Sequence, residues 1–189
     1  MLIDTTDTAS RVFAANRARG AVAFEVHAND GVTRRGDLHE SGSLRVRFPS
    51  PEAAGLSAVF VNTAGGIAGG DRFEIDLAVR KNARLAVTTA AAEKVYRSHG
   101  PSADLDIALK VDAAAHLAWL PQETILFDEA HRARRFEIDM APDACLLAVE
   151  VVILGRRARG EIALSARLAD QWRVRRAGRL VYADALRLT

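Results

Sequence analysis

Three copies of one pattern decide the fold: Phe73-Glu-Ile-Asp-Leu-Ala-Val-Arg-Lys-Asn-Ala-Arg-Leu85, then Leu105-Asp-Ile-Ala-Leu-Lys-Val-Asp-Ala-Ala-Ala-His-Leu117, then a copy running from Phe136 to Leu146. In each copy apolar and polar residues alternate, a polar turn follows, and a second alternating run begins. We align the third copy with Phe136 at the place of Leu105, which makes its turn two residues shorter. Repeats of this length are typical of stacked, similar units. The pattern predicts stacked β-hairpins that cover one another's apolar faces.

The flanking sequence continues with a period of two. Residues 20–27 lead into Asp30-Gly31, a strong hairpin signal, and residues 43–48 form another alternating run before Pro49. A last hairpin, from Trp172 to Tyr182, is expected to turn at Ala177-Gly178. The predicted fold is therefore all-β or strongly β-dominated: stacked β-hairpin repeats forming a β-sandwich or β-helix-like domain. It has at most one or two short helices, for which residues 52–57 and 90–97 are the candidates.

Length and composition indicate one globular domain. The chain has 189 residues, 49% of them hydrophobic and 26% charged. We expect a flexible tail over residues 1–19 and a single domain over residues 20–189, with further strands missing after Thr189. The sequence shows neither a signal peptide nor a membrane span, and its one cysteine, Cys145, stands beside Leu146 and Leu147, which predicts a buried thiol. A cytoplasmic location is expected.

Charge is distributed unevenly along the chain. Residues 151–189 contain nine arginines against Glu161, Asp170 and Asp184, although the whole chain carries only +2. This basic end lacks the interleaved aromatic residues and the motifs of a nucleic-acid-binding protein. We expect no nucleic acid, and an acidic protein partner is favoured over it; a merely solvated strand face is the alternative.

Four glycines lie in the segment Asn62-Thr-Ala-Gly-Gly-Ile-Ala-Gly-Gly-Asp71. The segment has no Gly-Lys-Ser/Thr and precedes a strand, whereas a phosphate-binding loop precedes a helix. We therefore expect a tight loop with positive φ angles, in which backbones approach closely. Recognition of a partner by this loop is the alternative.

Catalytic and closed metal sites find no support. The five histidines never occur at the spacings that place two imidazoles on one ion, and there is no Gly-x-Ser-x-Gly elbow. Carboxylates do recur beside glycines and at strand ends: Asp71, Glu93, Glu123, Asp128, Glu150 and Glu161. Such oxygens suit transient handling of a divalent cation, although ordinary ion pairs with neighbours such as Lys94, Arg97 and Arg156 are the favoured explanation.

Several motifs in order resemble the UreD (UreH) family of urease accessory proteins. They are residues 62–71, residues 88–97 (Thr-Thr-Ala-Ala-Ala-Glu-Lys-Val-Tyr-Arg) and residues 119–127 (Trp-Leu-Pro-Gln-Glu-Thr-Ile-Leu-Phe). The likeness continues through Glu150, Leu-Gly-Arg at 154–156, Gly160-Glu161 and the hairpin at Trp172.

The resemblance implies a non-enzymatic metallochaperone scaffold. It would bind apo-urease with UreF, reach the GTPase UreG through UreF, and assist nickel delivery and lysine carbamylation in urease. Dimerisation within that complex is left open. No cofactor is expected to bind tightly, and nickel would pass transiently.

Carried over residue by residue, the nickel passage would be lined by Asp71, Glu123, Asp128, Glu150 and Glu161. Further motif residues are Asn62, Gly65, Gly66, Gly69, Gly70, Lys94, Tyr96, Arg97, Gln122 and Arg156. Two alternatives stay open: a metal-dependent hydrolase with Asp71, Glu123 and Glu150 as ligands, and a purely structural adaptor.

Overall fold

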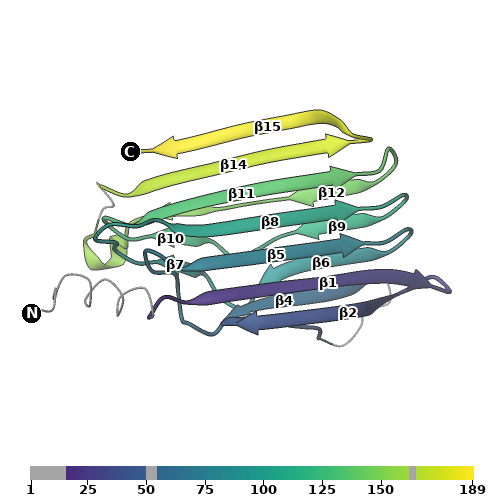
Figure 1. Ribbon diagram of the computed structural model, residues 1–189, viewed down its shortest axis with the longest axis horizontal. Coiled ribbons are helices and arrows are strands. Elements are labelled where there is room, and N and C mark those ends of the chain that lie inside the picture. Colours follow the sequence, from purple (N-terminus) through teal and green to yellow (C-terminus); the bar gives the residue numbers. More distant parts are fainter. Residues whose placement is uncertain (1–15, 50–54, 162–164) are drawn as a thin grey trace, which may run out of the picture.

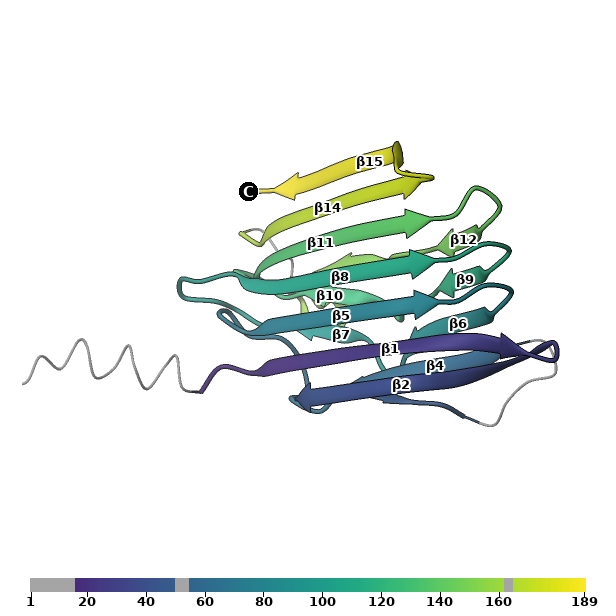
Figure 2. The ribbon, with the colours of Figure 1, turned by 45° about the vertical axis from the view of Figure 1, so that its right-hand side comes forward.

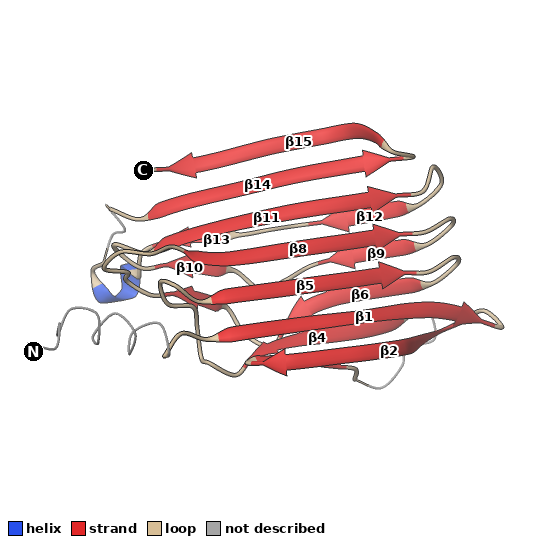
Figure 3. Ribbon diagram, in the orientation of Figure 1, coloured by secondary structure: helices blue, strands red, loops and turns tan. Residues whose placement is uncertain are grey.

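The computed structural model describes residues 16–49, 55–161 and 165–189. Within these ranges almost all regular structure is β, and the only helical element is a short 3-10 turn, η1 (Arg157–Arg159) (Figure 3). The β-dominated fold class is thus confirmed. No helix in the described part of the chain has the length and apolar character needed to cross a membrane.

The strands form three sheets. The largest contains β1 (Arg19–Asn29), β2 (Val32–Gly42), β5 (Arg72–Val79), β8 (Ala103–Val111), β11 (His131–Met140), β14 (Arg167–Arg176) and β15 (Arg179–Leu188). Its order is β15-β14-β11-β8-β5-β1-β2. The second sheet, in the order β12-β9-β6-β4-β3, contains β3 (Leu44–Arg47), β4 (Leu56–Asn62), β6 (Arg84–Thr89), β9 (His116–Trp119) and β12 (Cys145–Ala148). The third contains β7 (Glu93–Val95), β10 (Thr124–Leu126) and β13 (Val152–Leu154), in the order β13-β10-β7.

Each sequence repeat contributes one strand to each sheet, which makes a β-solenoid. The strands β5, β6 and β7 belong to the first repeat, β8, β9 and β10 to the second, and β11, β12 and β13 to the third. Equivalent strands of successive repeats pair in parallel, so the long strands stack in front of the short ones (Figure 1). The predicted stacking is confirmed, but the two strands of a repeat lie in different sheets and do not pair with each other as a hairpin.

The register of the third repeat differs from the prediction. Leu105 pairs with Phe73 as expected, but Leu105 also pairs with Arg134, and Phe136 pairs with Ile107. The third repeat is therefore shifted by two residues from our alignment, and its turn is as long as the others. The residues Phe-Glu-Ile-Asp occur at 73–76 and again at 136–139, and this identity favours the wrong register. A shift of two residues along a strand leaves the same side chains facing inward, so alternation alone does not distinguish the two registers.

Four-residue turns join the first and second sheets in every repeat. Each ends in a buried alanine, Ala83, Ala115 or Ala144, whose N–H donates to the carbonyl three residues earlier. Backbone bonds also link one turn to the next, as from His116 N to Ala83 O. These alanines are buried where the chain turns from one sheet to the other, so only a small side chain fits there.

Antiparallel hairpins flank the stack at both ends of the largest sheet (Figure 2). The strands β1 and β2 turn at Asp30 and Gly31, and β14 and β15 turn at Ala177 and Gly178; all four residues have positive φ angles. This is the geometry expected of two-residue hairpin turns, and both predictions are confirmed. Residues 90–97, one of the two helix candidates, contain β7 instead. Of the other candidate, residues 52–57, residues 52–54 lie outside the described residues, and Leu56 and Ser57 begin β4.

A row of aromatic rings runs through the core across the repeats. Phe24 contacts Phe60, Phe60 contacts Trp119, Trp119 meets Phe136 edge-on at 5.6 Å, and Phe136 stacks on Trp172 at 3.9 Å. The row crosses from one sheet to the other and ties successive repeats together.

The prediction of a buried Cys145 is wrong, because this residue is exposed. It lies on β12, the last strand of its sheet, so no following strand covers it. Of the predicted flexible tail, residues 1–15 lie outside the described residues. Just after them, Arg17 donates to the carbonyl of Gly69 at 3.1 Å.

Candidate functional site

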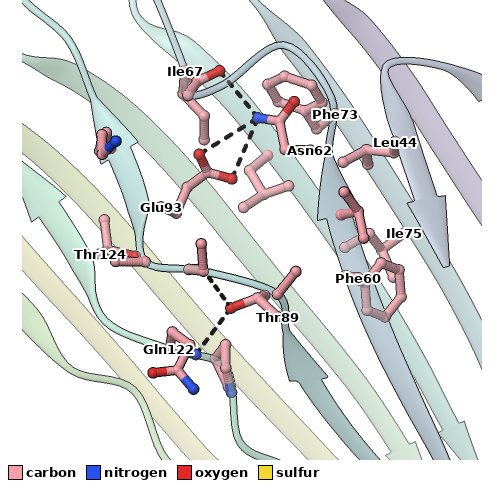
Figure 4. Close-up of a pocket in the computed structure, with 18 of the residues that line it drawn as sticks. Leu44, Phe60, Asn62, Ile67, Phe73, Ile75, Thr89, Glu93, Gln122 and Thr124 are labelled. Atoms are coloured by element: carbon pink, nitrogen blue, oxygen red, sulfur yellow. Dashed lines mark hydrogen bonds between the residues drawn. The ribbon is translucent and has the colours of Figure 1, made fainter. Parts of the chain in front are cut away.

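A cavity of about 260 Å³ lies between the sheets, inside the solenoid (Figure 4). Its apolar wall is formed by core residues such as Phe60, Phe73 and Ile107. Its polar lining comes from the glycine loop at residues 62–71, from β11, and from the end of β6 and the segments that follow the second strand of each repeat: Asn62, Thr89, Glu93, Gln122, Thr124, Arg132, Arg134 and Glu150. The cavity therefore combines an enclosed apolar shape with ionisable groups, which is the usual character of a binding site.

The glycine loop is the tight turn that the sequence predicts. Gly65, Gly66 and Gly70 have positive φ angles, and a Cβ added to Gly66 would lie 2.4 Å from the ring of Tyr96. The Tyr96 hydroxyl donates to the carbonyl of Gly65 at 2.9 Å. Only glycine permits this close approach.

Asp71 closes the loop from inside. Its carboxylate accepts hydrogen bonds from the backbone N–H of Ala18 at 2.8 Å and of Ala68 at 2.7 Å, and the residue is buried. Both carboxylate oxygens are thereby engaged with the backbone. Among the residues predicted to line a nickel passage, Asp71 has a contact pattern that stabilises the loop.

Glu93 places a carboxylate at the polar side of the cavity. Asn62 Nδ2 lies 3.3 Å and 3.4 Å from its two oxygens and also donates to the carbonyl of Gly66 at 3.0 Å (Figure 4). Burial raises the pKa of Glu93, and the hydrogen bond from Asn62 and the charge of Arg132 oppose that rise. A carboxyl with a raised pKa keeps its proton to higher pH, so a proton competes with a cation for its oxygens.

Two arginines on β11, Arg132 and Arg134, point inward, where the alternation of the strand calls for apolar side chains. Arg134 forms an ion pair with Glu150 at 2.6 Å and a two-pronged pair with Asp170. Burial lowers the pKa of Arg134, but the hydrogen bonds and charges of Asp170 and Glu150 outweigh burial and raise it. Glu150 also accepts a bond from Trp119 Nε1 at 2.9 Å, so the buried charges are well satisfied.

The hydrogen-bond donors of the buried Arg132 have fewer partners than those of Arg134. Its Nη1 donates to Thr124 Oγ1 at 3.2 Å, and its Nε has no hydrogen-bond partner within the described residues. Burial, together with the nearby charge of Arg134, lowers the pKa of Arg132 to about 10.

A second hollow of about 470 Å³ lies under the final hairpin. Trp172, Tyr182 and Leu186 of β14 and β15 line it, together with residues of β12 and β13. Arg134, Glu150 and Asp170 form an ionic cluster. Because Arg134 and Glu150 line both hollows, this ionic cluster lies between them.

Four of the predicted site residues, Asp128, Glu161, Arg156 and Arg97, do not line the first cavity. Asp128 and Glu161 form a separate cluster, in which Glu161 pairs with Arg156 and accepts a bond from the Asp128 N–H at 2.8 Å. The Arg156 guanidinium lies 4.0 Å from the ring centre of Phe127. Arg97 forms an exposed ion pair with Glu129.

Of the five carboxylates predicted for a nickel passage, only Glu150 lines the first cavity, and the structure does not bring the five together. Asn62, Gly65, Gly66, Lys94 and Gln122 also line it. No group of three or more histidine, cysteine, aspartate or glutamate side chains in the described ranges is placed to hold a metal ion.

Sequence reasoning missed Arg132, Arg134 and Asp170. A signal was present: on a strand with a period of two, Arg132 and Arg134 share a face with Phe136 and Ile138. Arginines in that register are inward-facing, and buried arginines require acidic partners.

Fold and site together define a β-solenoid protein with an internal ionic cluster between two hollows. A family model described as UreD urease accessory protein matches residues 17–189. The chain is 66% identical over 185 residues to the urease accessory protein UreD of Rhodopseudomonas palustris strain HaA2, which covers 98% of this chain and 66% of that protein. It is 64% identical over 179 residues to the protein of the same name from Bradyrhizobium diazoefficiens, covering 95% of this chain and 65% of that protein. The chain therefore belongs to the UreD family of urease accessory proteins, and it spans about two thirds of the length of these relatives.

Proposed function

We propose that this protein is a cytoplasmic, non-catalytic urease maturation factor that binds apo-urease with UreF, meets UreG through UreF, and passes nickel onward without holding it tightly. Family membership supports the urease part of the proposal. The nickel part rests on one observation: the cavity has carboxylates at its polar side, Glu93 and Glu150, and Glu150 also faces the second hollow.

The chemistry of these two carboxylates fits transient handling of a cation. Hard oxygen donors bind divalent metals less tightly than imidazole or thiolate sites, and two carboxylates are too few for a closed site. Glu93 has a raised pKa, so a proton competes with the metal for it. Arg134 competes with the metal for Glu150. Both effects weaken the binding of nickel in the cavity and favour its release.

The proposal is tested by urease maturation in cells that carry the other urease genes. The gene for this protein is deleted and then restored as wild type, Glu93→Gln, or Glu137→Gln. Glu137 lies on the outer face of the largest sheet, where it pairs with Arg173 at 3.0 Å and Arg175 at 2.7 Å, so it controls for loss of one carboxylate outside the cavity. We expect Glu93→Gln to lower urease activity and the nickel content of purified urease in parallel, whereas Glu137→Gln restores both.

Two further measurements separate the components of the proposal. Co-purification of Glu93→Gln with urease and UreF at the wild-type level is expected, because Glu93 lies in the interior. Full urease activity in the deletion strain would refute the maturation role. Hydrolysis of urea or GTP by the purified protein alone would contradict the non-catalytic assignment.

A purely structural adaptor is the second candidate. It is favoured by Asp71 and Glu161, whose carboxylates bond to the backbone or to a neighbouring arginine and hold loops. In that case Glu93→Gln leaves the nickel content of urease unchanged. A Gly66→Ala change, which distorts the glycine loop, then lowers complex formation.

A further inference from the structure

The geometry points to an anion-binding site at Arg132: we infer that its guanidinium binds a small monovalent oxyanion of the carboxylate or carbonate type inside the cavity. This inference concerns a ligand other than nickel and holds whether or not nickel passes through the cavity.

The first step is the unfilled hydrogen-bonding capacity of Arg132. A guanidinium has five N–H donors. The structure gives Arg132 one bond, to Thr124, and leaves its Nε without a partner in the described part of the chain, although the residue is only 3% exposed. None of the ion pairs formed among the described residues includes Arg132. A buried cation with this few acceptors is rare in proteins unless a ligand supplies them.

The neighbouring arginines show what a satisfied guanidinium looks like on the same strand. Arg134 faces the same way as Arg132 and pairs with Glu150 and Asp170. Arg135 faces outward and forms a fork with Asp106, at 2.6 Å and 3.1 Å. Arg132 alone of these three lacks the carboxylate that a planar guanidinium recognises with two parallel bonds.

The second step is the space beside Arg132. The residue lines the 260 Å³ cavity together with Thr89, Gln122 and Thr124, whose side chains add neutral polar groups. Such a volume accommodates an ion of three or four heavy atoms along with ordered water. An apolar ligand would leave the guanidinium unpaired, whereas an oxyanion supplies the missing acceptors.

The third step concerns the charge of the ligand. Arg134 with Glu150 and Asp170 carries a net charge of about −1 when both carboxylates are ionised, and the cavity also contains Glu93. A divalent anion such as phosphate would therefore meet repulsion from two sides. A monovalent ion such as bicarbonate or formate fits the one unpaired cation.

The experiment measures binding of bicarbonate to the purified protein without nickel, from the line broadening of ¹³C-labelled bicarbonate and from the Tm followed by circular dichroism, at constant ionic strength set with chloride. Four proteins are compared: wild type, Arg132→Met, Arg132→Lys and Arg135→Gln. We expect saturable broadening and a rise in Tm for wild type and Arg135→Gln, and neither for Arg132→Met. Arg132→Lys keeps the positive charge but loses the two parallel N–H donors of the guanidinium, so its affinity for bicarbonate is expected to fall by about tenfold.

Several results would overturn the inference. One is that the wild type does not bind bicarbonate, and another is that it binds chloride equally well. A third is that Arg132→Lys binds bicarbonate as tightly as the wild type; this variant decides the matter should Arg132→Met fail to fold. The same chemistry has a second source, a carboxylate side chain inserted by a protein partner. That source would show as no effect of bicarbonate or formate on the free protein together with loss of complex formation in Arg132→Lys, and it too would refute a free-anion site.

Discussion

Removing the Arg134 guanidinium is expected to destabilise the protein strongly. In Arg134→Gln, the carboxylates of Glu150 and Asp170 would face each other with no cation between them; their side chains are only 12% and 6% exposed. Breaking a buried ion pair by deleting one partner costs about 3–5 kcal/mol. Glu150 keeps its bond from Trp119, which offsets part of the loss, so we expect about 3 kcal/mol, or roughly 10 °C in Tm for a chain of this size.

The neighbouring residue supplies a matched control. Arg135 is on the same strand, but its side chain is 61% exposed and its pair with Asp106 lies on the outer face. Arg135→Gln removes the same charge and is expected to change stability by less than about 0.5 kcal/mol. The assay is urea and thermal unfolding of the two variants and the wild type, followed by circular dichroism.

The loss in Arg134→Gln should also depend on pH. Without Arg134, the negative charges of the two buried carboxylates repel each other with no cation between them, and acid weakens that repulsion. The variant is therefore expected to be closer to wild type at about pH 5 than at about pH 8. Equal Tm changes for Arg134→Gln and Arg135→Gln, or a loss independent of pH, would show that the ionic cluster does not stabilise the fold.

Three further changes test the loop and the cavity. Asp71→Asn leaves one backbone N–H facing an amide group instead of a carboxylate, so we expect a loss of about 2 kcal/mol in urea unfolding, and a loss below a few tenths would contradict the closing role of Asp71. Gly66→Ala forces a Cβ against Tyr96 at a φ of 151° and is expected to lower stability by about 1–3 kcal/mol, while Gly100→Ala, with open space at its Cβ, serves as its control; similar Tm values for both would refute the close approach. Burial raises the pKa of Glu93 above its ordinary 4.5, so its contribution to stability is full below pH 4.5 and is lost as pH rises through the folded-state pKa. Glu93→Gln should therefore gain stability relative to wild type as pH rises, and a constant difference across the pH range would show that Glu93 does not titrate in this way.

The overall class of the fold was predictable because the strand pattern repeats three times. Alternation predicts the strands, and two Xaa-Gly pairs predict the hairpins at Asp30 and Ala177, where local conformational preference decides the turn. The local sequence does not determine which strands pair with each other or which sheet each strand joins. Whether Phe73 and Leu85 belong to one hairpin or to two sheets depends on the neighbouring repeats, which a single repeat does not reveal.

The candidate site was only partly predictable. The glycine loop and Glu150 belong to sequence motifs, and the structure places both at the cavity. Arg134 and Asp170 were missed because each is an ordinary charged residue in its own strand, and they become a pair only when β11 and β14 align. Cys145 was misassigned for a related reason, since apolar neighbours predict burial only where another strand covers them.

The aromatic row gives the protein its own optical reporters. The two tryptophans of the chain both belong to that row. Trp119 donates to Glu150, and Trp172 lies 5.7 Å from the Arg134 guanidinium, so each indole adjoins the ionic cluster. Indole emission responds to local electric fields and is quenched by nearby paramagnetic ions. Intrinsic fluorescence therefore provides a label-free signal for what enters or leaves the two hollows, without attaching a dye to the protein.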